Sequence, residues 1–154
     1  MTVDISGQPP ASVDVDALRQ FAAATLEREG VGSDALLTIS FVGTDEIADL
    51  NQRFLGKQGP TDVLSFPIED AVPGSPPLPV EGGPPLTLGD IFLSTDVVSA
   101  HADDFGVTFD DELHLMVCHG VLHILGWDHE DDEEAERMEA REAHHLATIG
   151  KERR

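Results

Sequence analysis

Three histidines in the second half of the chain have the spacing of a metal site. His119 and His123 are four residues apart in the run LMVCHGVLHIL, so on a helix they lie one turn from each other on the same face. Gly126 can adopt the left-handed conformation that turns the chain, which would bring His129 toward the same point. Three imidazoles with a fourth position open are typical of catalytic zinc, which acidifies a bound water to a pKa of about 7. The spacing predicts one Zn²⁺ or other divalent ion per chain and hydrolytic chemistry.

The residues next to these histidines argue against one class of zinc hydrolase. The spacing HxxxHxxGxxH is also that of the metzincin proteases, but Gly120 stands where their HExxH pattern has its glutamate base. Hydrolysis of a peptide or amide is therefore an alternative with less support. Asp128, next to the third histidine, is the catalytic candidate, because its carboxylate could orient an imidazole or accept a proton from metal-bound water. If each histidine were instead an isolated polar residue, two imidazoles on an apolar helix would lack partners.

The elements that must position these residues indicate an α+β fold in a single domain over residues 1–154. We expect a small mixed four-stranded sheet with about five helices packed on it, because the strands come early and the helices late. A Pro/Gly-rich loop is expected over residues 67–87, since seven of the ten prolines fall between Pro67 and Pro85. Periodicity places strands near 3–5, 36–42, 61–66 and 88–94, and helices over 12–29, 44–55, 95–105, 110–125 and 131–149. Ser12 is the expected N-cap of the first helix.

Composition excludes several classes of function. Thirty acidic residues against nine basic ones give a formal charge of −21, which disfavours nonspecific capture of nucleic acid or of an anionic membrane. A single cysteine, Cys118, excludes an intramolecular disulfide framework. The N-terminus lacks the pattern of a signal peptide, and no apolar stretch reaches the roughly 20 residues of a membrane span. We therefore expect a cytoplasmic protein with no membrane partner.

Four segments resemble the endoribonuclease YbeY family. HGVLHILGWDH, from His119 to His129, is similar to the family signature HGxLHLxGYDH. GPTDVLSFP over 59–67, LGDIFLS over 88–94 and LNQRFLGK over 50–57 are similar to further family segments and occur in the same order. The resemblance implies an α+β hydrolase that binds one zinc through its three histidines. It also implies a single-strand-specific endoribonuclease that acts in maturation of the 16S rRNA 3′ end and in ribosome quality control.

The chain departs from this family pattern where substrate phosphate would bind. The family has YRGK at the helix end, whereas Leu55 occupies the arginine position here, and Trp127 replaces the tyrosine of the signature. Lys57 is the better candidate for a phosphate contact, because Arg53 lies two residues earlier, about 200° around the helix. Ser65 could hydrogen-bond substrate or, alternatively, satisfy nearby backbone.

The distribution of charge along the chain also predicts a partner that delivers the substrate. No lysine or arginine lies between Lys57 and Arg137, an interval that contains every candidate metal ligand. We therefore expect ribosomal RNA to be delivered by the small ribosomal subunit or by a protein adaptor. A non-enzymatic ribosome-associated zinc protein remains an alternative. The other four histidines are expected at the surface, and the acidic run over 130–142 is expected to form a solvated helix face.

Overall fold

The computed structural model describes residues 1–154 and has five helices and a four-stranded mixed sheet. The predicted α+β class is therefore confirmed. None of the helices is both long and apolar enough to cross a membrane. In chain order the elements are β1 (Thr2–Gly7), α1 (Val15–Arg28), β2 (Ala35–Val42), α2 (Thr44–Leu55), β3 (Val63–Pro67), β4 (Leu86–Ser94), α3 (Thr95–Phe105), α4 (Phe109–Ile124) and α5 (Asp132–Ala147).

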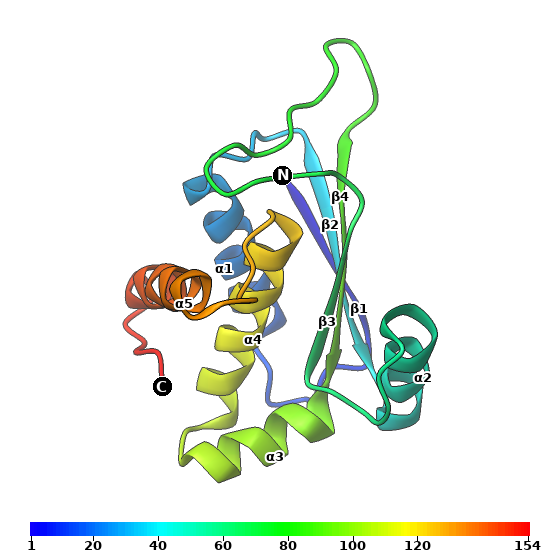
Figure 1. The fold of residues 1–154 in the computed structure, drawn as a ribbon, viewed down its shortest axis with the longest axis vertical. Coiled ribbons are helices and arrows are strands. Elements are labelled where there is room, and N and C mark those ends of the chain that lie inside the picture. Colours follow the sequence, from blue (N-terminus) through cyan, green and yellow to red (C-terminus); the bar gives the residue numbers. More distant parts are fainter.

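The sheet has the strand order β1-β2-β4-β3, with β3 at one edge. β1, β2 and β4 run parallel, whereas β3 is antiparallel to β4, with Val63 opposite Leu93 and Pro67 opposite Gly89. Helices α1, α4 and α5 lie on one side of the sheet and α2 on the other (Figure 1). The free edge of β3 therefore lies between α2 and α4.

Helix α4 is the central helix of the molecule. Its residues are buried almost all the way round, because it packs against the sheet on one side and against α1 and α5 on the others. It contributes Leu113, Val117, Val121 and Leu122, each inaccessible to solvent, to a hydrophobic core of 25 residues. This packing makes α4 a fixed support for any side chain that it carries at the surface.

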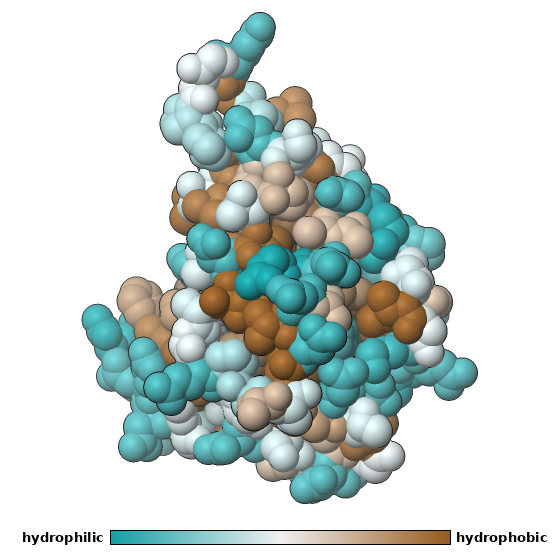
Figure 2. Space-filling view, turned by 180° about the vertical axis from the view of Figure 1, so that it is seen from behind, coloured by the Kyte–Doolittle hydropathy of each residue, from teal (hydrophilic) through white to brown (hydrophobic).

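Several predicted boundaries were wrong. Helix α1 begins at Val15 because the Asp14 side chain, rather than Ser12, accepts the hydrogen bond from the Ala17 amide. The loop between β3 and β4 is shorter than 67–87, since Pro67 ends β3, and the Leu86 amide, at the start of β4, donates to the Asp34 carbonyl. The loop projects beyond the body of the molecule (Figures 1 and 2).

Two histidines expected at the surface are buried. His114 packs edge to face against Phe21, with a ring centroid distance of 5.3 Å. His145 is fully buried, accepts a hydrogen bond from Arg28 and donates one to Glu29. His114 Nδ1 lies 2.8 Å from the Asp110 carbonyl, so both buried imidazoles have hydrogen-bond partners, which is why their burial is tolerated.

Candidate metal centre and adjoining groove

The structure brings His119, His123 and His129 together, as the spacing predicts. The ring centroids of His119 and His123, on neighbouring turns of α4, are 4.4 Å apart. The His129 ring, which follows the turn after α4, lies 5.4 Å from the first and 5.0 Å from the second. One ring nitrogen of each residue lies within 4.8 Å of the other two. The three side chains thus form a compact set of nitrogen donors.

Hydrogen bonds to the other ring nitrogens select the tautomer that a metal needs. His123 donates through Nδ1 to the Trp127 carbonyl at 2.8 Å, and His119 Nδ1 lies 3.4 Å from a Glu142 carboxylate oxygen. Because both partners only accept, both Nε2 atoms carry lone pairs when the rings are neutral. These Nε2 atoms are 2.9 Å apart, close to the roughly 3.3 Å expected between two imidazole ligands of tetrahedral zinc. The donor set fits a divalent ion.

Burial favours the neutral form of His123. Desolvation, together with the neighbouring His119 ring, lowers the pKa of His123 to about 4. Near neutral pH this imidazole is therefore uncharged, as a metal ligand must be.

Gly126 makes the turn that carries His129. Its φ of 94° lies in the left-handed region, and a Cβ atom there would collide with the Ala71 carbonyl of the projecting loop. The Trp127 amide donates to the Leu122 carbonyl at 3.0 Å and closes the turn. The expected turning role of Gly126 is therefore matched by the structure, which also shows that the loop packs against it.

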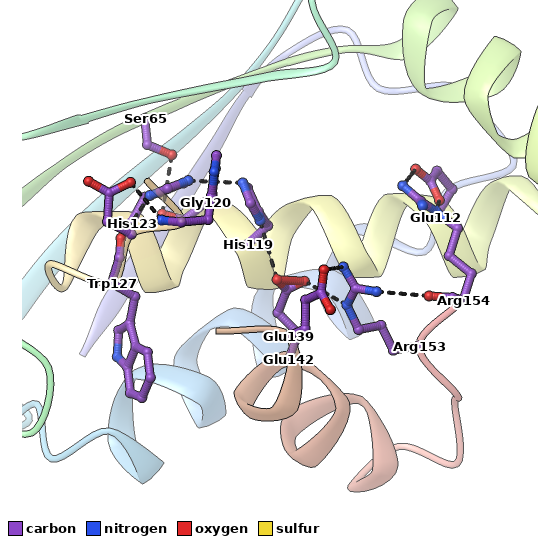
Figure 3. A network of polar contacts seen from close by, with 12 residues as sticks. Ser65, Glu112, His119, Gly120, His123, Trp127, Glu139, Glu142, Arg153 and Arg154 are labelled. Carbon is purple, nitrogen blue, oxygen red and sulfur yellow. Dashed lines mark hydrogen bonds and ion pairs between the residues drawn. The ribbon is translucent and has the colours of Figure 1, made fainter. Parts of the chain in front are cut away.

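Glu142 is a site residue that sequence reasoning missed. Its side chain, on α5, is only 2% exposed and lies between His119 and Arg153, whose Nε donates to it at 3.3 Å (Figure 3). The available signal was its place on the buried face of α5, which it shares with Met138, His145 and Leu146. A carboxylate behind a ligand imidazole fixes the ring and raises its basicity.

A second buried carboxylate holds the turn that follows α4. The Trp127 indole donates through Nε1 to Glu29 at 3.1 Å, and the same carboxylate accepts from Arg141 at 2.6 Å. The tryptophan thus keeps a hydrogen-bond donor where the family signature has tyrosine. Since the Trp127 carbonyl holds His123, this ion pair indirectly positions a ligand ring.

A groove of about 670 Å³ extends from the three histidines past residues of β3 to the end of α2. It is lined by Lys57 and Leu55 from the α2 end and by Ser65 from β3, together with the histidines. Arg53 does not line it and forms an exposed ion pair with Asp49 at 3.2 Å. Of the predicted substrate-binding residues, the structure therefore places Lys57 and Ser65 beside the histidines and leaves Arg53 outside.

Lys57 is unique among the nine basic side chains. It makes neither an ion pair nor a hydrogen bond, whereas seven others pair with carboxylates and Arg28 is held by His145. Its ammonium group is therefore free to bind an anion in the groove.

The remaining polar candidates have local partners. The Ser65 hydroxyl donates to the Gly120 carbonyl at 3.2 Å, and Asp128 Oδ1 accepts from the His129 amide at 2.8 Å. Asp128 makes no hydrogen bond to an imidazole, and its Oδ2 has no partner. A Cβ at Gly120 would lie 3.0 Å from the Ile91 side chain and 3.2 Å from the Ser65 hydroxyl, so a glutamate there, as in HExxH proteases, would require both side chains to shift.

A second group of possible ligands consists of Asp62, His101 and Glu112. Its buried carboxylate, Glu112, already accepts two hydrogen bonds from Arg154, at 2.6 and 3.1 Å. The guanidinium supplies the positive charge there, so the histidine cluster is the better place for a metal ion.

Comparisons with known proteins show which family the chain resembles over most of its length. The family model described as Endoribonuclease YbeY matches residues 8–150. An Endoribonuclease YbeY from Salinispora tropica is 41% identical over 152 residues, covering 96% of each chain. Another from Micrococcus luteus is 38% identical over 138 residues, covering 90% of this chain and 85% of the relative.

Among solved structures, the solution structure of TM1509 from Thermotoga maritima has a similar fold. The TM-score is 0.59 and the sequence identity 29%, with 96% of this chain and 91% of that chain covered. The fold, the histidine cluster and the match over nearly the whole chain lead to one conclusion: this chain belongs to the endoribonuclease YbeY family.

Proposed function

We propose that the protein is a zinc-dependent, single-strand-specific endoribonuclease that matures the 16S rRNA 3′ end and takes part in ribosome quality control. Family membership supports cleavage of RNA in rRNA processing. The observation that carries the metal dependence is the pair of Nε2 atoms, on His119 and His123, that face each other with both Nδ1 atoms engaged. His129 completes the donor set at the wall of the groove.

Polar residues of the groove have separate roles in phosphodiester cleavage. When bound, a divalent ion provides Lewis-acid activation of the nucleophile and neutralises phosphate charge. Lys57 binds the substrate phosphate through its unpaired ammonium group. Asp128 takes a proton from the nucleophile on Oδ2, since Oδ1 is occupied by the His129 amide. The Ser65 hydroxyl, which donates to Gly120, offers its remaining lone pairs to a substrate hydroxyl.

The charge of the groove supports delivery by a partner. Three carboxylates, Asp62, Asp128 and Glu130, line the groove and face the single cation Lys57. Naked RNA is therefore repelled until it is positioned beside the histidines. The small ribosomal subunit, or an adaptor protein, supplies that position in the cytoplasm, since holding two reactants in place lowers the barrier to reaction.

The function is tested by offering the zinc-loaded protein a labelled single-stranded RNA, the same RNA as a duplex, isolated small subunits and casein. We expect slow cleavage of the single strand, none of the duplex, and faster cleavage when subunits are present. Chelation of zinc and the His123→Ala variant should both abolish cleavage. Cleavage of casein but not of RNA would establish a peptide hydrolase instead, and binding to subunits without any cleavage would establish a non-enzymatic role.

A further inference from the structure

The C-terminal end of α2 carries two adjacent, large apolar side chains at the surface. Phe54 is 59% exposed and Leu55 is 49% exposed. Exposed leucines are common, but an exposed phenylalanine ring next to a candidate active site presents a π surface that the fold does not use. Its surroundings indicate what kind of group could cover it.

The Phe54 ring is held by other aromatic rings. It packs edge to face against Phe66 of β3 at 5.3 Å, and Phe66 packs in the same way against Phe92 of β4 at 5.7 Å. Phe66 and Phe92 are half-buried in the outer face of the sheet. Phe54 is thus supported by neighbouring rings while more than half of its surface stays exposed, so it loses little conformational entropy when a flat group packs on it.

The only basic residues between Arg28 and Arg137 flank this ring. The guanidinium carbon of Arg53 lies over the Phe54 ring, 5.4 Å from its centroid, and the Lys57 side chain lines the groove with Leu55 and has no partner. In a chain with a formal charge of −21, this corner combines an exposed aromatic ring with nearby positive charge. That combination suits a flat group attached to an anionic backbone.

The corner is continuous with the groove that leads to the histidines. Leu55, next to Phe54, and Pro67, next to Phe66, both line that groove together with His119 and His123. A strand that lies in the groove and passes Leu55 therefore arrives at the Phe54 ring.

We propose that Phe54 forms a base-stacking subsite, which holds an unpaired nucleobase of the RNA strand whose backbone lies along Lys57. This inference rests on the proposed function and extends it to the choice of substrate. Bases inside a duplex already stack on their neighbours, so only a single strand can place a base on this ring. The subsite therefore provides a physical reason for single-strand specificity.

The test measures the affinity of the full-length, zinc-loaded protein for a fluorescent single-stranded oligoribonucleotide and for the same strand with abasic positions. A gel after each titration checks that the strands have not been cleaved. Phe54→Ala should weaken binding of the normal strand about tenfold. Phe54→Trp should preserve binding, because the ring is retained. Phe54→Leu, which keeps an apolar contact with Phe66, should weaken binding as much as alanine does. On the abasic strand, all four proteins should bind with the same affinity.

Phe105→Ala is the matched control. Phe105 is also a phenylalanine at the end of a helix and is 53% exposed, but the Arg154 guanidinium covers its ring at 3.5 Å. This variant should bind both strands like the wild type. Equal affinity of Phe54→Ala and wild type would refute the subsite, as would an equal loss on the abasic strand. A wild-type protein that neither binds nor cuts any RNA would refute the proposed function itself.

Discussion

On the α4 side of the groove two of the three histidine rings are held by hydrogen bonds from within the fold, whereas on the α2 side Lys57, Phe54 and Leu55 extend from an exposed helix end. His119 uses Nδ1 for the buried Glu142 carboxylate, and His123 uses Nδ1 for the Trp127 carbonyl. The Lys57 side chain lines the groove and forms no ion pair and no hydrogen bond. The side assigned to chemistry is therefore preorganised, and the side assigned to substrate is open for contacts that only a ligand can complete.

Two ion pairs with buried carboxylates and partly exposed arginines support the α4 side. Glu142, paired with Arg153, contacts a ligand ring, and Glu29, paired with Arg141, holds the Trp127 indole. Breaking such a pair leaves a buried charge without compensation, which is strongly destabilising. The α2 side has only the surface pair of Arg53 and Asp49, and exposed pairs of this kind contribute little to stability.

The largest expected effect follows from removing one ligand. His123→Ala should weaken zinc binding more than about 100-fold, beyond the loss usual for residues that only support ligands. Zinc at 1,000 times its Kd stabilises a folded protein by about 4 kcal/mol, and the variant should lose this gain. Elemental analysis and thermal unfolding with and without zinc measure both effects. The control variant His144→Ala removes an exposed imidazole and should change neither the zinc content nor the thermal stability. Full zinc content in His123→Ala would contradict the metal assignment.

The histidine cluster could be predicted because its signal is local. Four-residue spacing and a turning glycine lie within the eleven residues from His119 to His129. The contact of Glu142 with His119 could not be predicted in this way, because it depends on how α5 packs on α4. The contact of Phe54 with Phe66 likewise depends on which face of the sheet α2 covers. The sequence predicts His145 at the surface, because no sequence pattern indicates that Glu29 and Arg28 lie beside it. Fold class followed from element order, since each strand and helix has its own periodicity.

A smaller loss of zinc affinity is expected when the carboxylate that contacts a ligand imidazole is changed. Glu142→Gln keeps an acceptor near His119 but removes the charge, so zinc affinity should fall about tenfold. Competition with a chelator measures this, and unfolding of the zinc-free variant separates it from loss of stability. Glu139→Gln alters a half-exposed partner of Arg153, at 3.6 Å, and should leave zinc affinity unchanged. Equal effects of the two variants would mean that Glu142 acts only through Arg153.

A gain in RNA affinity is expected from a substitution on the α2 side of the groove. Leu55→Arg restores a cation in the groove, and a charged hydrogen bond to phosphate contributes about 1.5 to 3 kcal/mol. Affinity for single-stranded RNA should therefore rise tenfold or more, which a binding titration at fixed salt measures. Leu78→Arg makes the same change of charge at an exposed loop position outside the groove, and it should have a much smaller effect. An unchanged affinity in Leu55→Arg would show that RNA does not pass this corner.

The smallest effect concerns Lys57 and the salt dependence of binding. For naked RNA we expect affinity to fall as salt is lowered, because repulsion between two polyanions is then least screened. A phosphate contact by Lys57 opposes this trend, since each neutralised phosphate of a single strand contributes a slope of about −0.7 in log K against log salt. Lys57→Gln should therefore make the slope more positive by about 0.7, measured by titrations at several salt concentrations. Arg137→Gln makes the same change in net charge on the exposed surface of α5, where Arg137 pairs with Glu133. If both variants shift the slope equally, Lys57 acts through net charge alone and the α2 side makes no specific phosphate contact.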